Sequence, residues 1–295
     1  MISRLFLSLA ILLLTYTTSA QSAPSVVVSI KPIHSIVSFL MQGVGEPQLL
    51  LEANNSAHSF HIRPSQVKAL ENADLIVSID PKFEAGLANI LSNYSKSSQL
   101  VIGELSLPNF YPLRENTHQS KEVEYDYHLW LDTNNARSIA KQLSYRLIEI
   151  DAINTPIYFS NFEKFDAKLL QLDKDNYEQL AGLDAANFAN YSDTLQYFEK
   201  NYSLNKPIII TTYHGARLSI RGVLNAKKKM KEQQTKCLFH TNEINFEKTK
   251  VITEDTAIIR AEINILGNEL ESGPDQYFKL MKNLTSQIAQ CLHLQ

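Results

Sequence analysis

The chain has 295 residues, 44% of them hydrophobic, and a formal net charge of −3 at pH 7. This length can form one large or two modest domains with real cores. The small net charge gives no electrostatic basis for binding nucleic acid or an anionic membrane. The basic cluster 227–231 is followed directly by Glu232, and this mixture of charges favours a solvated loop or helix end.

The first twenty residues have the pattern of a secretory signal peptide. Arg4 gives a short basic start, Leu5 to Leu14 form an apolar block, and Thr18-Ser19-Ala20 is a small-residue exit. The block is too short for a stable membrane span, and a buried N-terminal helix is the alternative. The nearest cysteine is Cys237, so no lipid anchor can form beside the exit. We therefore expect residues 1–20 to be removed and the mature chain to be exported without a membrane span.

Strand and helix patterns alternate through the first half of the mature chain. The strand patterns are short apolar runs, and the helix patterns carry apolar residues at three- and four-residue steps. The predicted strands are 25–30, 73–79 and 100–102, and the predicted helices are 33–41, 64–72 and 137–150. Because parallel strands need long crossovers, this alternation indicates βαβ units.

A single long helix is predicted from Pro156 to about Leu183. Its apolar residues recur at helical spacing, and neither Gly nor Pro interrupts them before Gly182. At 1.5 Å per residue the helix would be roughly 40 Å long, which is more than a crossover needs. Since a packed helix of this length resists bending, we expect no large hinge closure between the parts that it joins.

Beyond this helix the βαβ pattern starts again. A strand is predicted at 207–213, and apolar residues from Tyr277 to Cys291 form one face of a C-terminal helix. The predicted fold class is α/β, with two βαβ-type lobes joined by a long rigid backbone helix. The expected organisation is a signal peptide at 1–20, an N-terminal lobe at 21–154, the backbone helix at 155–183 and a C-terminal lobe at 184–295.

The two cysteines, Cys237 and Cys291, are predicted to form a disulfide. An exported protein folds in an oxidising compartment, where thiols pair. Cys291 lies on the predicted C-terminal helix and Cys237 begins a short apolar run. A bridge would therefore fix the last helix to the body of its lobe, and two free buried thiols are the alternative.

Three of the eight histidines lie in contexts that suit a metal site. His58 is in a polar loop that leads into a helix, His128 lies beside the single Trp, and His214 follows a predicted strand. Ligands gather at the carboxyl ends of strands in α/β sheets, and imidazole is a preferred ligand of zinc. No HxxxH or CxxC pair occurs, so the spacing alone does not indicate a metal site. Taken singly, each histidine fits an ordinary loop residue better than a ligand. His61 is a substitute ligand or a supporting group.

Two of these contexts together resemble a known family. His58 with Arg63-Pro64-Ser65 and Ala73-Asp74-Leu75, combined with the stretch from Asp126 to Leu131, resembles the zinc-binding component of bacterial high-affinity zinc uptake ABC transporters, the ZnuA-like cluster A-I solute-binding proteins. The opening Ser29-Ile30-Lys31-Pro32 and the cysteine pair are also similar to that family. The resemblance covers the mature chain and is weakest beyond the predicted long helix.

The resemblance implies a zinc ion in the cleft between the two lobes. It implies a periplasmic monomer that delivers Zn²⁺ to the permease of an ABC transporter and is not an enzyme. The zinc ligands of the family correspond to His58 and His128, and its third histidine corresponds best to His214. Its fourth ligand, an aspartate shortly before a glycine, falls on Asn264 in this chain.

Asn264 is the main departure from the family pattern. An amide lacks the negative charge of a carboxylate and is a weaker oxygen donor, so the charge of the zinc ion would be uncompensated. Water, Glu262 or Glu269 would then complete a tetrahedral site. The His-rich loop of the family is also absent, since the stretch before Asp126 contains only His118. We expect a zinc binder with an altered C-terminal lobe and lower affinity.

Other classes of protein remain open at this point. Three histidines with an open fourth position would suit a zinc hydrolase, but the chain has no HExxH or comparable pairing. A divergent metal-binding paralogue is the second alternative, either a manganese or iron carrier or a chaperone or adhesin-like protein without high-affinity zinc transport. Manganese and iron favour more carboxylate ligands, so a third histidine would argue for zinc.

Overall fold

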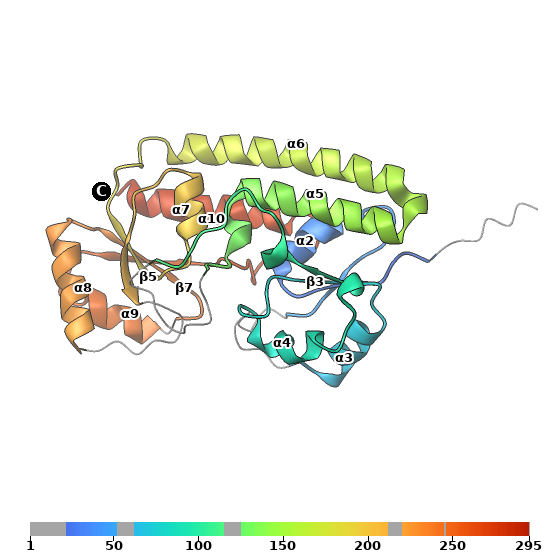
Figure 1. Ribbon diagram of the computed structural model, residues 1–295. Coiled ribbons are helices and arrows are strands. Elements are labelled where there is room, and N and C mark those ends of the chain that lie inside the picture. The colour runs from blue at the N-terminus through green and yellow to red at the C-terminus, as the bar shows by residue number, and fades with distance from the viewer. Residues whose placement is uncertain (1–21, 52–61, 115–124, 212–219, 245, 295) are drawn as a thin grey trace, which may run out of the picture.

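The computed structural model describes residues 22–51, 62–114, 125–211, 220–244 and 246–294. Two α/β lobes lie side by side, and the long helix α6, Thr155–Leu180, runs along one side of both (Figure 1). The predicted signal peptide at 1–20 lies outside the described residues. Within them, no helix is long and apolar enough to cross a membrane.

The N-terminal lobe is built on a four-stranded parallel sheet of order β2-β1-β3-β4. The two inner strands are completely buried apolar runs, as is typical of parallel sheets covered on both faces. The strands are β1 Val26–Val28, β2 Gln48–Leu49, β3 Leu75–Ser78 and β4 Gln99–Val101, and the helices are α2 Lys31–Leu40, α3 Pro64–Glu71 and α4 Ala85–Leu91.

The C-terminal lobe has a second four-stranded parallel sheet, of order β6-β5-β7-β8. Its inner strands β5 and β7 are buried along their whole length. The strands are β5 Phe188–Ser192, β6 Ile208–Thr211, β7 Cys237–Thr241 and β8 Ile259–Ile263, and the helices are α7 Gln196–Asn201, α8 Ile220–Glu232, α9 Phe246–Thr253 and α10 Gln276–Leu292. The basic cluster 227–231 lies at the end of α8, as predicted.

A helical spine connects the two sheets. Helix α5, Thr133–Ile150, leads into α6, which has 26 residues and packs against α2, α5 and α10. The ring of Phe165 on α6 lies 5.5 Å from Phe39 of α2 and 5.2 Å from Phe278 of α10. One continuous apolar core therefore extends from the first sheet through the spine to the inner part of the second lobe. This continuity supports the expectation of little hinge motion.

The predicted disulfide is present between Cys237 at the start of β7 and Cys291 near the end of α10. Their Cα atoms are 6.1 Å apart, within the usual range for a bridge. The bond fixes α10 to an inner strand of the C-terminal sheet, while Phe278 on the same helix packs against the N-terminal lobe. Helix α10 thus holds both lobes.

Candidate metal site

His128 lies at the junction between the lobes, directly before a short 3₁₀ turn at Leu129–Leu131. Its backbone N–H donates to Asp126 Oδ1 at 3.0 Å, and its ring Nδ1 lies 2.7 Å from the same oxygen. Both side chains are buried. A carboxylate at Nδ1 fixes the imidazole orientation and leaves Nε2 as the nitrogen through which a metal would bind.

Aromatic rings surround His128 and exclude water from it. The Phe83 ring packs edge-on at 5.3 Å between centroids, and the Trp130 ring lies at 5.5 Å. Trp130 is completely buried and donates through Nε1 to the carbonyl of Ile265, while its own carbonyl accepts from Tyr277. His128 is therefore connected to the C-terminal lobe and sits where electrostatic interactions are strong.

A hydrogen bond connects the chain on the two sides of segment 52–61, which contains His58 and His61. Leu50 follows strand β2, and Gln66 lies in the first turn of α3. The Gln66 side chain donates to the Leu50 carbonyl at 2.6 Å and accepts from the Arg63 backbone at 2.8 Å. His58 and His61 themselves lie outside the described residues.

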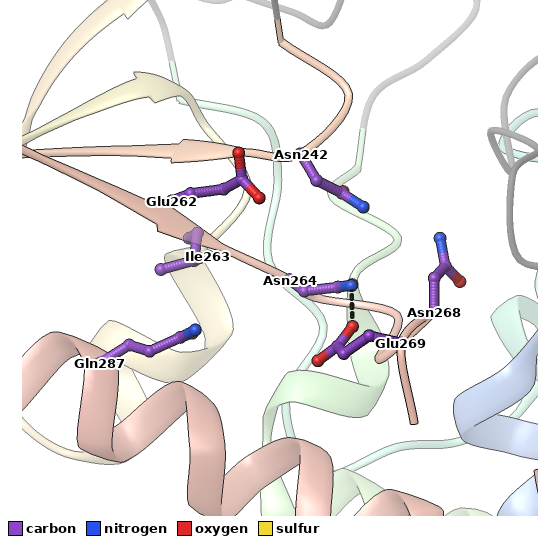
Figure 2. A pocket seen from close by; sticks show the side chains of 7 residues that line it. All are labelled: Asn242, Glu262, Ile263, Asn264, Asn268, Glu269 and Gln287. Carbon is purple, nitrogen blue, oxygen red and sulfur yellow. Dashed lines mark hydrogen bonds between the residues drawn. The ribbon is translucent and has the colours of Figure 1, made fainter. Parts of the chain in front are cut away.

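Asn264 lies just beyond strand β8, and both polar atoms of its side chain are engaged. Its Oδ1 accepts from the backbone N–H groups of Leu266 at 3.1 Å and Gly267 at 2.8 Å, and its Nδ2 donates to Glu269 (Figure 2). Gly267 has φ +64°, which permits this tight turn. An aspartate here would keep the two backbone bonds and present a second oxygen, whereas the amide presents a donor.

A polar pocket surrounds this turn. Its lining residues are Asn242, Glu262, Ile263, Asn264, Asn268, Glu269 and Gln287 (Figure 2). Glu262 and Glu269, the carboxylates expected as substitute ligands, are both exposed in it. Lys31, at the start of α2, donates to the carbonyls of Asn268 and Leu270, which ties the turn to the N-terminal lobe.

A buried charged cluster lies between the lobes and was not anticipated from the sequence. Arg114 Nη1 is 3.1 Å from Asp193 Oδ1, and Nη2 contacts Glu199, which also accepts from Asn190 at 2.8 Å. Burial raises the pKa of Asp193 to about 6 and that of Glu199 to about 7, although Arg114 acts in the opposite direction. Asp193 directly follows β5, a strand that the sequence patterns did not reveal.

The structure places only part of the predicted ligand set. His128 and Asn264 are described, and His58, His61 and His214 lie outside the described residues. Strand β6 ends at Thr211, which pairs in register with Ser192 of β5, so the two strands end at the same edge of the sheet. In the described parts of the chain, no three His, Cys, Asp or Glu side chains form a group that could hold a metal ion. A complete site needs further donors or some rearrangement.

His34 has structural surroundings. His34 on α2 is buried, with Nε2 3.0 Å from the Pro47 carbonyl and Nδ1 3.4 Å from Ser38 Oγ. Burial lowers its pKa. His34 is therefore a packing residue of α2.

Two parallel-sheet lobes on a helical spine, with a buried imidazole where they meet, form the architecture of a two-lobed solute-binding protein. The chain belongs to the family described as ZnuA, zinc-uptake complex component A, periplasmic, whose sequence profile matches residues 26–291. The resemblance inferred from the sequence is thereby confirmed, and the protein is a binding component of periplasmic zinc uptake.

Individual relatives agree with this family. The chain is 27% identical to the high-affinity zinc uptake system protein ZnuA of Brucella abortus (strain 2308), covering 92% of this chain and 93% of that protein. A crystal structure of ZnuA superposes with a TM-score of 0.78 at 20% identity, over 92% of this chain and 99% of that one. The solute-binding protein FpvC of Pseudomonas aeruginosa, solved in complex with Mn²⁺, has a TM-score of 0.78 at 14% identity, with coverage of 92% and 99%.

Proposed function

We propose that the protein captures Zn²⁺ in the periplasm, as a monomer, and delivers it to the permease of an ABC transporter. The observation that carries the proposal is His128, a buried imidazole whose Nδ1 is held by Asp126. Neutral imidazole oriented by a carboxylate is a preferred zinc donor. Its place between the lobes suits a cargo that is held and then released.

We further propose His58 and His128 as the two central ligands, with His214 as the third and His61 as a substitute. The proposal for His58 rests on its sequence context, which matches the family whose profile covers residues 26–291. Asn264 could ligate through oxygen only by giving up its bonds to the backbone of its own turn. We therefore expect it to contribute less than an aspartate would.

A manganese or iron carrier is the second candidate. Three buried carboxylates, those of Asp126, Asp193 and Glu199, lie near the lobe junction, and these metals favour carboxylate oxygen. Zinc remains the better proposal because the family is one of zinc uptake and because His128 provides nitrogen.

The test is metal titration of the purified protein beside a His58→Ala/His128→Ala double variant. We expect one tightly bound equivalent of Zn²⁺, absent from the variant and not displaced by a modest excess of Mn²⁺. Preferential Mn²⁺ binding would favour the second candidate. A parent protein that binds neither metal would refute the carrier proposal.

A further inference from the structure

The carboxylate of Asp193 is buried in the charged cluster between the lobes. Its side chain is only 2% exposed. Neither of its oxygens accepts a hydrogen bond from the described residues. Its contact with Arg114 Nη1, at 3.1 Å, brings the charges together without the geometry of a hydrogen bond. A buried carboxylate normally has two or more such partners, so this one has unused capacity to bind a cation.

Asp193 also lies in the electrostatic field of the His128 site. His128 and Asp126 are both among the groups whose charges act on it. A hydrogen bond links the same two regions, because the Tyr197 hydroxyl on α7 donates to the Asp126 carbonyl at 2.7 Å. Asp193 directly follows β5, an inner strand of the C-terminal sheet. It therefore lies at the carboxyl end of that sheet, where ligands bind in α/β folds.

The charges around Asp193 favour a divalent cation. Three buried carboxylates, those of Asp126, Asp193 and Glu199, face one buried guanidinium, that of Arg114. A pKa of about 7 leaves Glu199 partly protonated at neutral pH, but the three carboxylates together still carry more negative charge than Arg114 neutralises. Lys206 and Lys200 also interact electrostatically with Asp193, but both are exposed, so water screens them. A buried excess of this sign is costly unless a cation compensates it.

We propose that Asp193 is the anionic metal ligand supplied by the C-terminal lobe. The inference rests on the proposed function and gives the bound ion the negative charge that Asn264 does not provide. Arg114 contacts both Asp193 and Glu199, so it can stay paired with Glu199 while Asp193 turns toward the metal. Such a turn is required, because the described side chains do not form a metal site as they stand.

The test compares Asp193→Asn with Glu199→Gln. Each variant removes one buried negative charge beside Arg114, but only the first removes the proposed ligand. Zinc affinity is measured by competition with a chromophoric chelator, and the visible absorption of bound Co²⁺ reports the ligand set. We expect Asp193→Asn to weaken zinc roughly 100-fold and to change the Co²⁺ spectrum, while Glu199→Gln changes the affinity by less than about tenfold and leaves the spectrum unaltered.

A third variant, Asp193→His, separates ligation from charge pairing. An imidazole can bind zinc but cannot neutralise Arg114, so we expect it to recover zinc affinity relative to Asp193→Asn. Equal weakening in Asp193→Asn and Glu199→Gln with an unchanged Co²⁺ spectrum would show that Asp193 is only a counter-ion of Arg114. Parent-like zinc binding by Asp193→Asn would overturn the inference and leave the carrier proposal intact. Absence of metal from the parent would overturn both.

Discussion

Reduction of the Cys237–Cys291 disulfide is expected to destabilise the protein by about 4 kcal/mol. The two residues are separated by 54 positions. A cross-link over a loop of that size removes about 14 cal/mol/K of chain entropy from the unfolded state, which is about 4 kcal/mol at room temperature. This is a large fraction of the stability of an ordinary domain. The effect depends on the length of the closed loop and not on which native elements the bridge joins.

Urea unfolding of the same protein with and without reductant measures this difference. A chelator is present in both titrations so that bound metal does not contribute to stability. A Cys237→Ala/Cys291→Ala variant serves as the control and should be insensitive to reductant. A difference below about 1 kcal/mol would refute the argument. It would mean that the reduced unfolded chain retains structure that already restricts it as much as the bond does.

Three further outcomes are expected. Asp126→Ala should weaken zinc binding by about 10- to 100-fold, as seen in chelator competition, because His128 loses the carboxylate that orients it. The double variant Asn264→Asp/Glu269→Gln restores a carboxylate at position 264 and removes the neighbouring one at 269 that would repel it. It should bind zinc about tenfold more tightly than the single variant Glu269→Gln, and equal affinities would contradict a role for this turn. Burial lowers the pKa of His34 in the folded protein, so on acidification the unfolded chain takes up a proton first and the free energy of unfolding should fall below about pH 6.5. In urea titrations, the His34→Gln variant should lose less of its free energy of unfolding between about pH 7.5 and about pH 5 than the parent protein does.

The regular parts of the fold could be predicted because their residues repeat with a clear period. Helices α6 and α10 each carry a long apolar stripe, and β1 and β3 are short runs of buried aliphatic residues. Strand β5 has the sequence Phe-Ala-Asn-Tyr-Ser and was missed, because polar Asn190 and Ser192 are buried by their surroundings rather than by their own character. Helix α2 begins at Lys31, two residues before the predicted start at 33, because Pro32 fits the first turn of a helix.

The candidate site could be predicted only where its residues lie in a recognisable local context. His128 is such a case, because Asp126 and Trp130 are its neighbours in the chain. The pairing of Arg114 with Asp193 joins residues that are far apart in sequence, and no local pattern announces it. The loss of charge at Asn264 could be anticipated, but the direction of its side chain could not, since that depends on the backbone of the turn.

The position of α10 has a consequence for the order in which the molecule can be assembled. A ribosome completes the N-terminal sheet long before the last helix exists, yet α2 of that lobe contacts Phe278 and receives a hydrogen bond at Ser35 from the Tyr277 backbone. Early in synthesis the first lobe therefore lacks part of its apolar cover. A chain that stops before Gln276 would leave aromatic surface open on both halves, and such truncated products should be preferred substrates for proteases and chaperones.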